Sequence, residues 1–73
     1  MPVSDPRVLF GRRLRELRLE RGLSQEKLAE LADLHQNYVG GVERGERNIA
    51  LSNIVALARA LKVRPSKLFE TIS

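Results

Sequence analysis

Apolar residues recur along most of this chain at steps of three and four, which is the spacing of an amphipathic α-helix. The stretch 51–61 repeats the pattern most clearly, with Leu51, Ile54, Leu57, Ala58 and Leu61 on one face. No segment alternates between apolar and polar residues over a useful length. The pattern predicts an all-α chain of five short helices with short connections.

Start and stop signals divide these helices. Residues 4–6 (Ser-Asp-Pro) begin the first helix, with Asp5 as the candidate N-cap, and Ser24 caps the second. Gly22 and Gly45 occupy positions typical of the residue just after a helix end. The inward faces of the first two helices are expected to carry Phe10, Leu14, Leu17, Leu28, Leu31 and Ala32.

The segment 35–45 (HQNYVGGVERG) contains two adjacent glycines, each of which costs a helix about 1 kcal/mol relative to Ala. Its residues nevertheless separate by face when they are placed at 100° intervals. One side collects Tyr38, Val39 and Val42, and the other collects Gln36, Asn37, Gly40, Gly41 and Arg44. We therefore expect a helix with a buried apolar face and an outward face of amides, an arginine and bare backbone.

The composition limits the function classes. Seventy-three residues form one domain over 1–73, and the absence of Cys together with a single His (His35) argues against disulfides, a zinc site or any cofactor. There is no acid–base cluster around His35 and no phosphate loop, so we expect no enzyme. No signal-peptide core and no apolar run near the ~20 residues of a membrane span is present, which favours a cytoplasmic protein with no membrane partner.

Charge and face chemistry point to nucleic acid. Thirteen basic against nine acidic residues give a net charge of +4 and a pI near 10.4, a balance that attracts polyanions, whether nucleic acid or an anionic membrane. Gln and Asn can bond adenine bidentately in the major groove, and Arg reaches guanine or phosphate. The helix beginning at Ser24, a three-residue turn and the next helix form a helix-turn-helix unit over about 24–44.

Three motifs carry a resemblance to a known family. They are GLSQEKLA (22–29), VERGERN (42–48) and ALARALKV (56–63). In this order and spacing, the chain resembles the Cro/CI-like (Xre) helix-turn-helix regulators, whose fold is a compact five-helix lambda-repressor-like domain. The pieces YVGGVER and RN are most similar to the controller proteins of restriction–modification systems.

The resemblance implies roles for individual residues. Gln25 would contact a phosphate, Gln36 and Asn37 would read base edges, and Arg18 and Glu43 would form a structural ion pair. Backbone contacts are implied for Arg47, Asn48 and Asn53, and the outward face adds Arg44, Gly40 and Gly41, the two glycines permitting close approach of DNA. The family usually has Ser or Thr where His35 stands, so the start of this helix is expected to be poorly capped.

Three assignments stay open. Tyr38 could belong to the core alone or reach a phosphate with its hydroxyl. The arginines of the first helix could contact DNA or form a solvated ion-pair face with Glu16 and Glu20. In the C-terminal helix, expected over about 65–72, Leu68, Phe69 and Ile72 could close the core or form a dimer interface.

The expected function is a sequence-specific transcriptional regulator that binds double-stranded DNA. It would bind a palindromic operator as a homodimer, with the recognition helix 35–44 in the major groove. By occupying promoter DNA, it would repress by blocking RNA polymerase or activate by touching it. The alternative is an antitoxin-type interaction module of the same fold, whose partner is a toxin protein.

Overall fold

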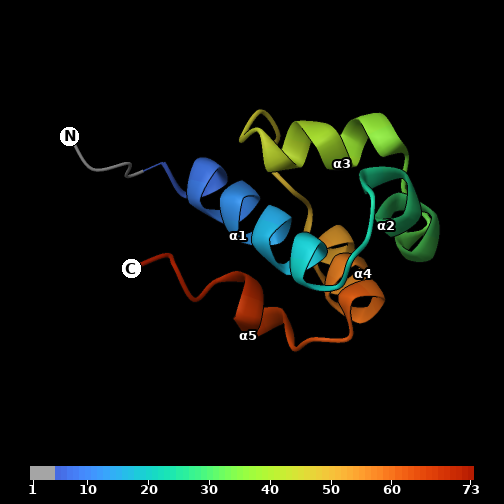
Figure 1. Ribbon diagram of the computed structural model, residues 1–73. Coiled ribbons are helices and arrows are strands. Elements are labelled where there is room, and N and C mark those ends of the chain that lie inside the picture. Colours follow the sequence, from blue (N-terminus) through green and yellow to red (C-terminus); the bar gives the residue numbers. More distant parts are fainter. Residues whose placement is uncertain (1–4) are drawn as a thin grey trace.

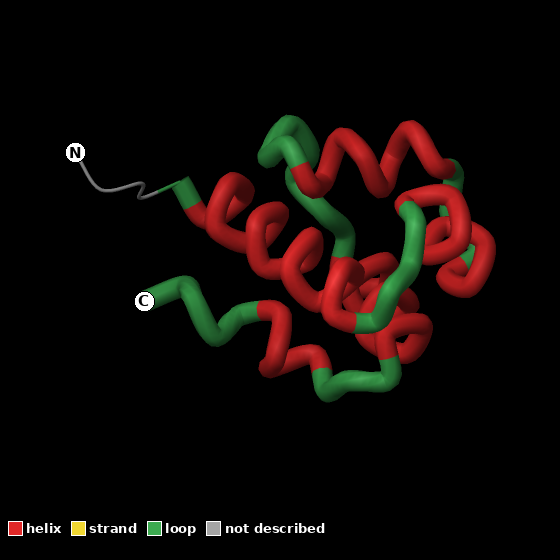
Figure 2. Tube along the Cα trace, in the orientation of Figure 1, coloured by secondary structure: helices red, strands yellow, loops and turns green. Residues whose placement is uncertain are grey.

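The computed structural model describes residues 5–73, which form five helices and no strand (Figures 1 and 2). The helices are α1 (Pro6–Glu20), α2 (Gln25–Ala32), α3 (Gln36–Glu43), α4 (Leu51–Leu61) and α5 (Pro65–Leu68). The all-α prediction is confirmed. Residues 1–4, on which Ser4 of the expected helix start and most of the signal-peptide argument fall, lie outside the described residues.

The helix starts follow the caps expected from the sequence. The Asp5 carboxylate accepts a hydrogen bond from the backbone N–H of Arg7 at 2.9 Å, and the Ser24 hydroxyl accepts one from Lys27 at 2.9 Å. Each bond satisfies a backbone donor that the first helical turn leaves without a partner. Asp33 ends α2 with φ 57°, in the left-handed region. It thereby turns the chain into α3 within three residues.

One apolar core joins the helices. In Figure 1, α1 runs between α3 and α5, and it packs against both, while α2 packs against α3 and α4. The expected inward positions are mostly correct, but Leu31 and Leu51 are 51% and 75% exposed. Leu31 faces a surface groove, and Leu51 is the first residue of its helix and extends beyond the core. The buried hydrophobic residues are Phe10, Leu14, Leu17, Leu28, Ala29, Ala32, Val39, Val42, Ile54, Leu57, Ala58, Leu61 and Leu68.

Gly11 permits a close approach between α1 and α3. A Cβ atom placed on Gly11 would lie 2.3 Å from the carbonyl oxygen of Val42 and 2.6 Å from that of Glu43. Both are backbone atoms of α3, so a side chain could fit only if α1 and α3 separated. Glycine at position 11 therefore allows the short distance between α1 and α3.

Gly45 is required for two independent reasons. Its φ of 76° lies in the left-handed region, and a Cβ atom there would lie 2.8 Å from Cγ2 of Val8. The chain consequently ends α3, turns sharply and passes against the start of α1.

The C-terminal helix is shorter than expected, since α5 ends at Leu68 and residues 69–71 form a turn. Leu68 is fully buried, while Phe69 is 41% exposed and packs its ring 5.4 Å from that of Phe10. Over residues 5–73 no helix is long and apolar enough to cross a membrane, and no group of His, Asp or Glu side chains is arranged to hold a metal ion.

Candidate nucleic-acid interface

The start of α3 is capped by an unusual residue. His35 precedes the helix, and its Nδ1 accepts a hydrogen bond from the backbone N–H of Asn37 at 3.2 Å. The expectation that His35 leaves this helix poorly capped is therefore wrong. An imidazole nitrogen without a proton performs the task usually given to a Ser or Asp oxygen. The bond requires the neutral ring with its proton on Nε2.

Gln36 and Asn37 occupy the first turn of α3, and both are exposed. Neither side chain takes part in a hydrogen bond among residues 5–73, where only the backbone of Asn37 is engaged. Their amide groups therefore keep all their donors and acceptors available. This is the arrangement that reading of base edges needs, because each amide must present a donor and an acceptor together.

A buried ion pair holds α3 to α1. The Arg18 Nε lies 2.6 Å from Oε2 of Glu43, and its Nη2 lies 3.0 Å from Oε1, so the contact is bidentate. Both side chains are more than nine-tenths buried. Arg18 also donates to the carbonyl oxygen of Leu23 at 2.8 Å. The structure thus brings together the two residues that the resemblance paired.

Gln25 belongs to this same network. Its Nε2 donates to Oε1 of Glu43 at 3.0 Å, so one carboxylate connects α1, α2 and α3. Nothing in the sequence indicated this bond, because the family resemblance implied only a phosphate contact for Gln25. In the free protein the amide nitrogen of Gln25 is already engaged, and its oxygen faces Gly40.

Tyr38 is the centre of a second cluster on α3. Its hydroxyl accepts a hydrogen bond from Nδ2 of Asn53 on α4 at 3.0 Å, and its ring lies under the guanidinium of Arg47 at 5.8 Å. The ring is half-buried against the core. Tyr38 therefore packs partly against the core while its hydroxyl is engaged by Asn53, and the phosphate contact that the sequence left open stays a prediction. Asn53 and Arg47 both lie at this surface.

The two glycines of α3 are not bare surface. Gly40 and Gly41 are both buried, contrary to the outward exposure expected from helical spacing. Side chains cover them: a Cβ atom on Gly40 would lie 3.1 Å from Nη1 of Arg44, and one on Gly41 would lie 3.2 Å from Cγ and Nε of Arg47. The direction of the two positions was predicted correctly, but long flexible side chains occupy the space above them.

Arg44 and Glu46 form an exposed pair after α3. The Arg44 Nε lies 2.9 Å from Oε2 of Glu46 and its Nη2 lies 3.3 Å from Oε1. The hydrogen bond from Arg44 holds the pKa of the Glu46 carboxyl below its usual value, and the charge of Arg44 adds to this effect. Asn48, the remaining residue expected to contact the DNA backbone, is exposed in the loop before α4.

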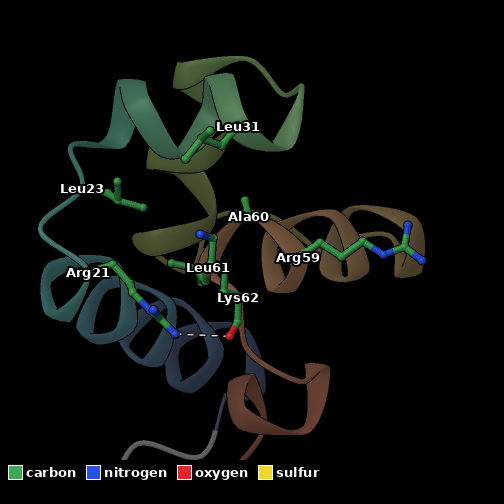
Figure 3. A pocket seen from close by; sticks show the side chains of 7 residues that line it. All are labelled: Arg21, Leu23, Leu31, Arg59, Ala60, Leu61 and Lys62. Carbon is green, nitrogen blue, oxygen red and sulfur yellow. Dashed lines mark hydrogen bonds between the residues drawn. The ribbon is translucent and has the colours of Figure 1, made fainter.

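A groove of about 530 Å³ lies on another part of the surface, between the end of α1, α2 and the end of α4 (Figure 3). Arg21 closes one side of it by donating to the carbonyl oxygen of Lys62 at 3.2 Å. None of the residues expected to contact DNA lines this groove. Its lining residues are Arg21, Leu23, Leu31, Arg59, Ala60, Leu61 and Lys62.

The expected dimer residues are placed unequally. Leu68, the last residue of α5, is fully buried and offers no surface, so it closes the core and the dimer-interface alternative is wrong for this residue. Phe69 and Ile72 remain accessible at the rim of a hollow of about 190 Å³ that also includes Arg47 and Asn48. The apolar C-terminal surface is thus adjacent to the loop that follows α3.

Two short helices, a three-residue turn and an exposed start of the second helix define a helix-turn-helix DNA-binding domain. The chain matches the family model described as Helix-turn-helix over residues 14–68. It belongs to the helix-turn-helix family of Cro/CI-like (Xre) regulators, so the resemblance found in the sequence is confirmed.

Individual relatives agree with this assignment. The restriction-modification controller protein C.AhdI from Aeromonas hydrophila is similar in structure, with a TM-score of 0.86 and 60% identity over 86% of this chain and 96% of that chain. Control protein C.BamHI from Bacillus amyloliquefaciens is 46% identical over 69 residues, which are 93% of this chain and 85% of that protein. Control protein C.SmaI from Serratia marcescens is 44% identical over 64 residues, which are 88% of this chain and 76% of that protein.

Proposed function

We propose that this protein is a transcriptional controller that binds a palindromic operator as a homodimer and inserts the start of α3 into the major groove. The observation that carries the proposal is the contrast within α3. Its first turn presents Gln36 and Asn37 with unengaged amides, while its last turn is held through the buried pair of Glu43 and Arg18. A recognition helix needs both properties, since base contacts require free side chains on an element of fixed orientation.

The proposed division of labour separates base reading from phosphate binding. Gln36 and Asn37 read base edges, and Arg47 and Asn48 hold the phosphate backbone from the loop after α3. In a dimer on a two-fold operator, the two recognition helices lie about 34 Å apart, one turn of DNA. On a promoter the bound dimer represses by blocking RNA polymerase or activates by touching it. The similarity to control proteins favours genes of a restriction–modification system as the target.

The test of DNA binding uses fragments of the DNA upstream of the protein's own gene and random duplexes of equal length. Specific binding should weaken steeply as salt rises, because each phosphate contact releases counterions. Gln36→Ala should cost about 1–3 kcal/mol and relax discrimination at one base pair. Arg47→Ala should weaken all sequences alike and lower the salt slope by about one unit.

Arg47 is the better phosphate variant for this comparison, because Gln25→Ala would also remove a hydrogen bond from the buried Glu43 carboxylate. Equal loss on all sequences for Gln36→Ala and Arg47→Ala would reject the placement of the recognition helix. If the unmodified protein shows no preference for its upstream DNA at moderate salt, the proposal that it is a sequence-specific regulator is rejected.

Dimer formation is proposed through the C-terminal surface at Phe69 and Ile72. Phe69→Glu should shift sedimentation from dimer to monomer, since the charge would be buried between two apolar surfaces. Leu31→Glu is the matched control, because Leu31 is similarly exposed but lies on α2, away from the C-terminal segment (Figure 1). If only Leu31→Glu dissociates the dimer, the interface lies at the groove of Figure 3 instead.

A further inference from the structure

Arg47 lies across the surface of α3 at Gly41. A Cβ atom on Gly41 would be 3.2 Å from both Cγ and Nε of Arg47 and 3.8 Å from its Cδ. The aliphatic stem and the start of the guanidinium therefore rest directly on the helix backbone. Any side chain at position 41 would occupy the space that Arg47 uses, although Arg47 itself comes from the loop after α3.

The far end of Arg47 is also located by contact. Its guanidinium carbon lies 5.8 Å from the centre of the Tyr38 ring, within the range of a cation–π interaction. The ring is held in turn, since the Tyr38 hydroxyl accepts a hydrogen bond from Asn53 on α4. Gly41 beneath the stem and Tyr38 beneath the guanidinium thus give Arg47 one defined path over the helix.

The hydrogen-bond donors of Arg47 remain unused. Among residues 5–73 its side chain forms neither a hydrogen bond nor an ion pair, whereas Arg44 is engaged by both oxygens of Glu46. An arginine whose aliphatic stem is held in position and whose donors are free is suited to bind a phosphate group, because its planar guanidinium can donate to two oxygens at once.

We propose that Gly41 is a positioning residue for DNA binding: its lack of a side chain lets Arg47 lie flat on α3 and stack on Tyr38, so that the guanidinium meets a phosphate already ordered. This inference rests on the proposed function. Ordering a long side chain at an interface costs about 0.5–1.5 kcal/mol. Removing the prior order should therefore weaken binding about two- to twelvefold.

The test measures binding of a random-sequence duplex at low salt, because a phosphate contact acts on every sequence. Gly41→Ala should weaken binding, and the larger Gly41→Leu should weaken it further. In an Arg47→Ala background neither change should have an additional effect. Gly40→Ala is the matched control, because it brings the same helix-propensity gain but faces Arg44 and Gln25. Its effect on duplex binding should be the same with and without Arg47.

A second measurement uses the free protein. In the unmodified chain the side-chain protons of Arg47 should show NMR shifts caused by the Tyr38 ring current, and Gly41→Leu should abolish them. If these shifts persist, the inference is wrong whatever the DNA result. If Gly41 variants weaken binding equally with and without Arg47, DNA itself approaches the helix at Gly41 and the positioning role is rejected. Failure of the unmodified protein to bind any duplex would instead reject the proposed function, while the NMR result would still judge the placement of Arg47.

Discussion

Gly11 and Gly41 are both glycines in the interior of a helix, and both are buried, but by different kinds of atom. Above Gly11 stand two carbonyl oxygens of α3, at 2.3 and 2.6 Å from the place of a Cβ atom. Above Gly41 stands the side chain of Arg47, which can rotate away. The first glycine is needed so that two backbones can approach, and the second is needed only if the position of Arg47 matters.

The kind of atom that covers each glycine shows how the two faces of α3 differ. Its inner face is held by contacts that cannot adapt: the backbone approach at Gly11 and the buried pair of Arg18 and Glu43. Its outer face is covered by arginines that can move when a ligand arrives. A helix of this kind keeps its orientation while its surface adjusts, and substitutions on the two faces should differ in both size and sign.

The largest effect is expected from Arg18→Met, which removes the partner of the buried Glu43 carboxylate. Breaking a buried pair in this way should lower the free energy of unfolding by about 3–5 kcal/mol, as measured by urea denaturation. Lys27→Met is the control, since its pair with Glu30 is exposed and should contribute little. The double variant Arg18→Met/Glu43→Met should recover most of the loss; a double variant as unstable as the single one would contradict this account.

The next largest effect is expected from Gly11→Ala. Alanine favours a helix over glycine by about 1 kcal/mol, yet the contact with the α3 carbonyls should make the variant less stable by about 1–3 kcal/mol. Thermal unfolding checks the sign. A variant more stable than the unmodified protein would show that α1 and α3 can separate without cost, and the inner face would not be rigid.

Gly41→Ala should change stability in the opposite direction. Because Arg47 can give way, the helix propensity of Ala should prevail and raise the free energy of unfolding by up to about 1 kcal/mol. The same thermal measurement applies. A loss comparable to that of Gly11→Ala would erase the distinction between the two faces.

The smallest expected effect concerns Glu46. Its pKa is lowered by the hydrogen bond from Arg44, so Arg44→Ala should raise the pKa towards the ordinary value of a glutamate. Because the folded-state pKa is depressed, the contribution of this pair to stability is present above the unfolded-state pKa and is lost as pH falls through the folded-state pKa. An NMR titration of the Glu46 carboxyl measures the shift. Lys67→Ala serves as the control, and an unchanged Glu46 pKa in Arg44→Ala would show that the pair does not persist in solution.

Features that depend on local sequence were predictable. Asp5 and Ser24 indicated the helix starts, and Gly22 and Gly45 indicated the helix ends, because capping involves residues only a few positions apart. The apolar face of α3 was also correct at Val39 and Val42.

Features that depend on how the chain folds back on itself were not predictable. Helical spacing placed Gly41 on the outer face but could not include Arg47, which follows the helix and folds back over it. Gly11 carried no signal at all, since its need arises from α3, about thirty residues away in the chain. Leu31 fitted the helical pattern but faces a groove, because periodicity does not reveal which part of a face finds a partner.

The unengaged side chains of Gln36 and Asn37 have an evolutionary consequence. Since no contact within the described fold depends on them, substitutions at these two positions should leave stability almost unchanged while altering which bases are preferred. The fold therefore places little constraint on which DNA sequence these two residues are proposed to read. Under the proposed function, a lineage built on this domain could acquire a new operator by changing these two residues, and only DNA binding would keep them unchanged.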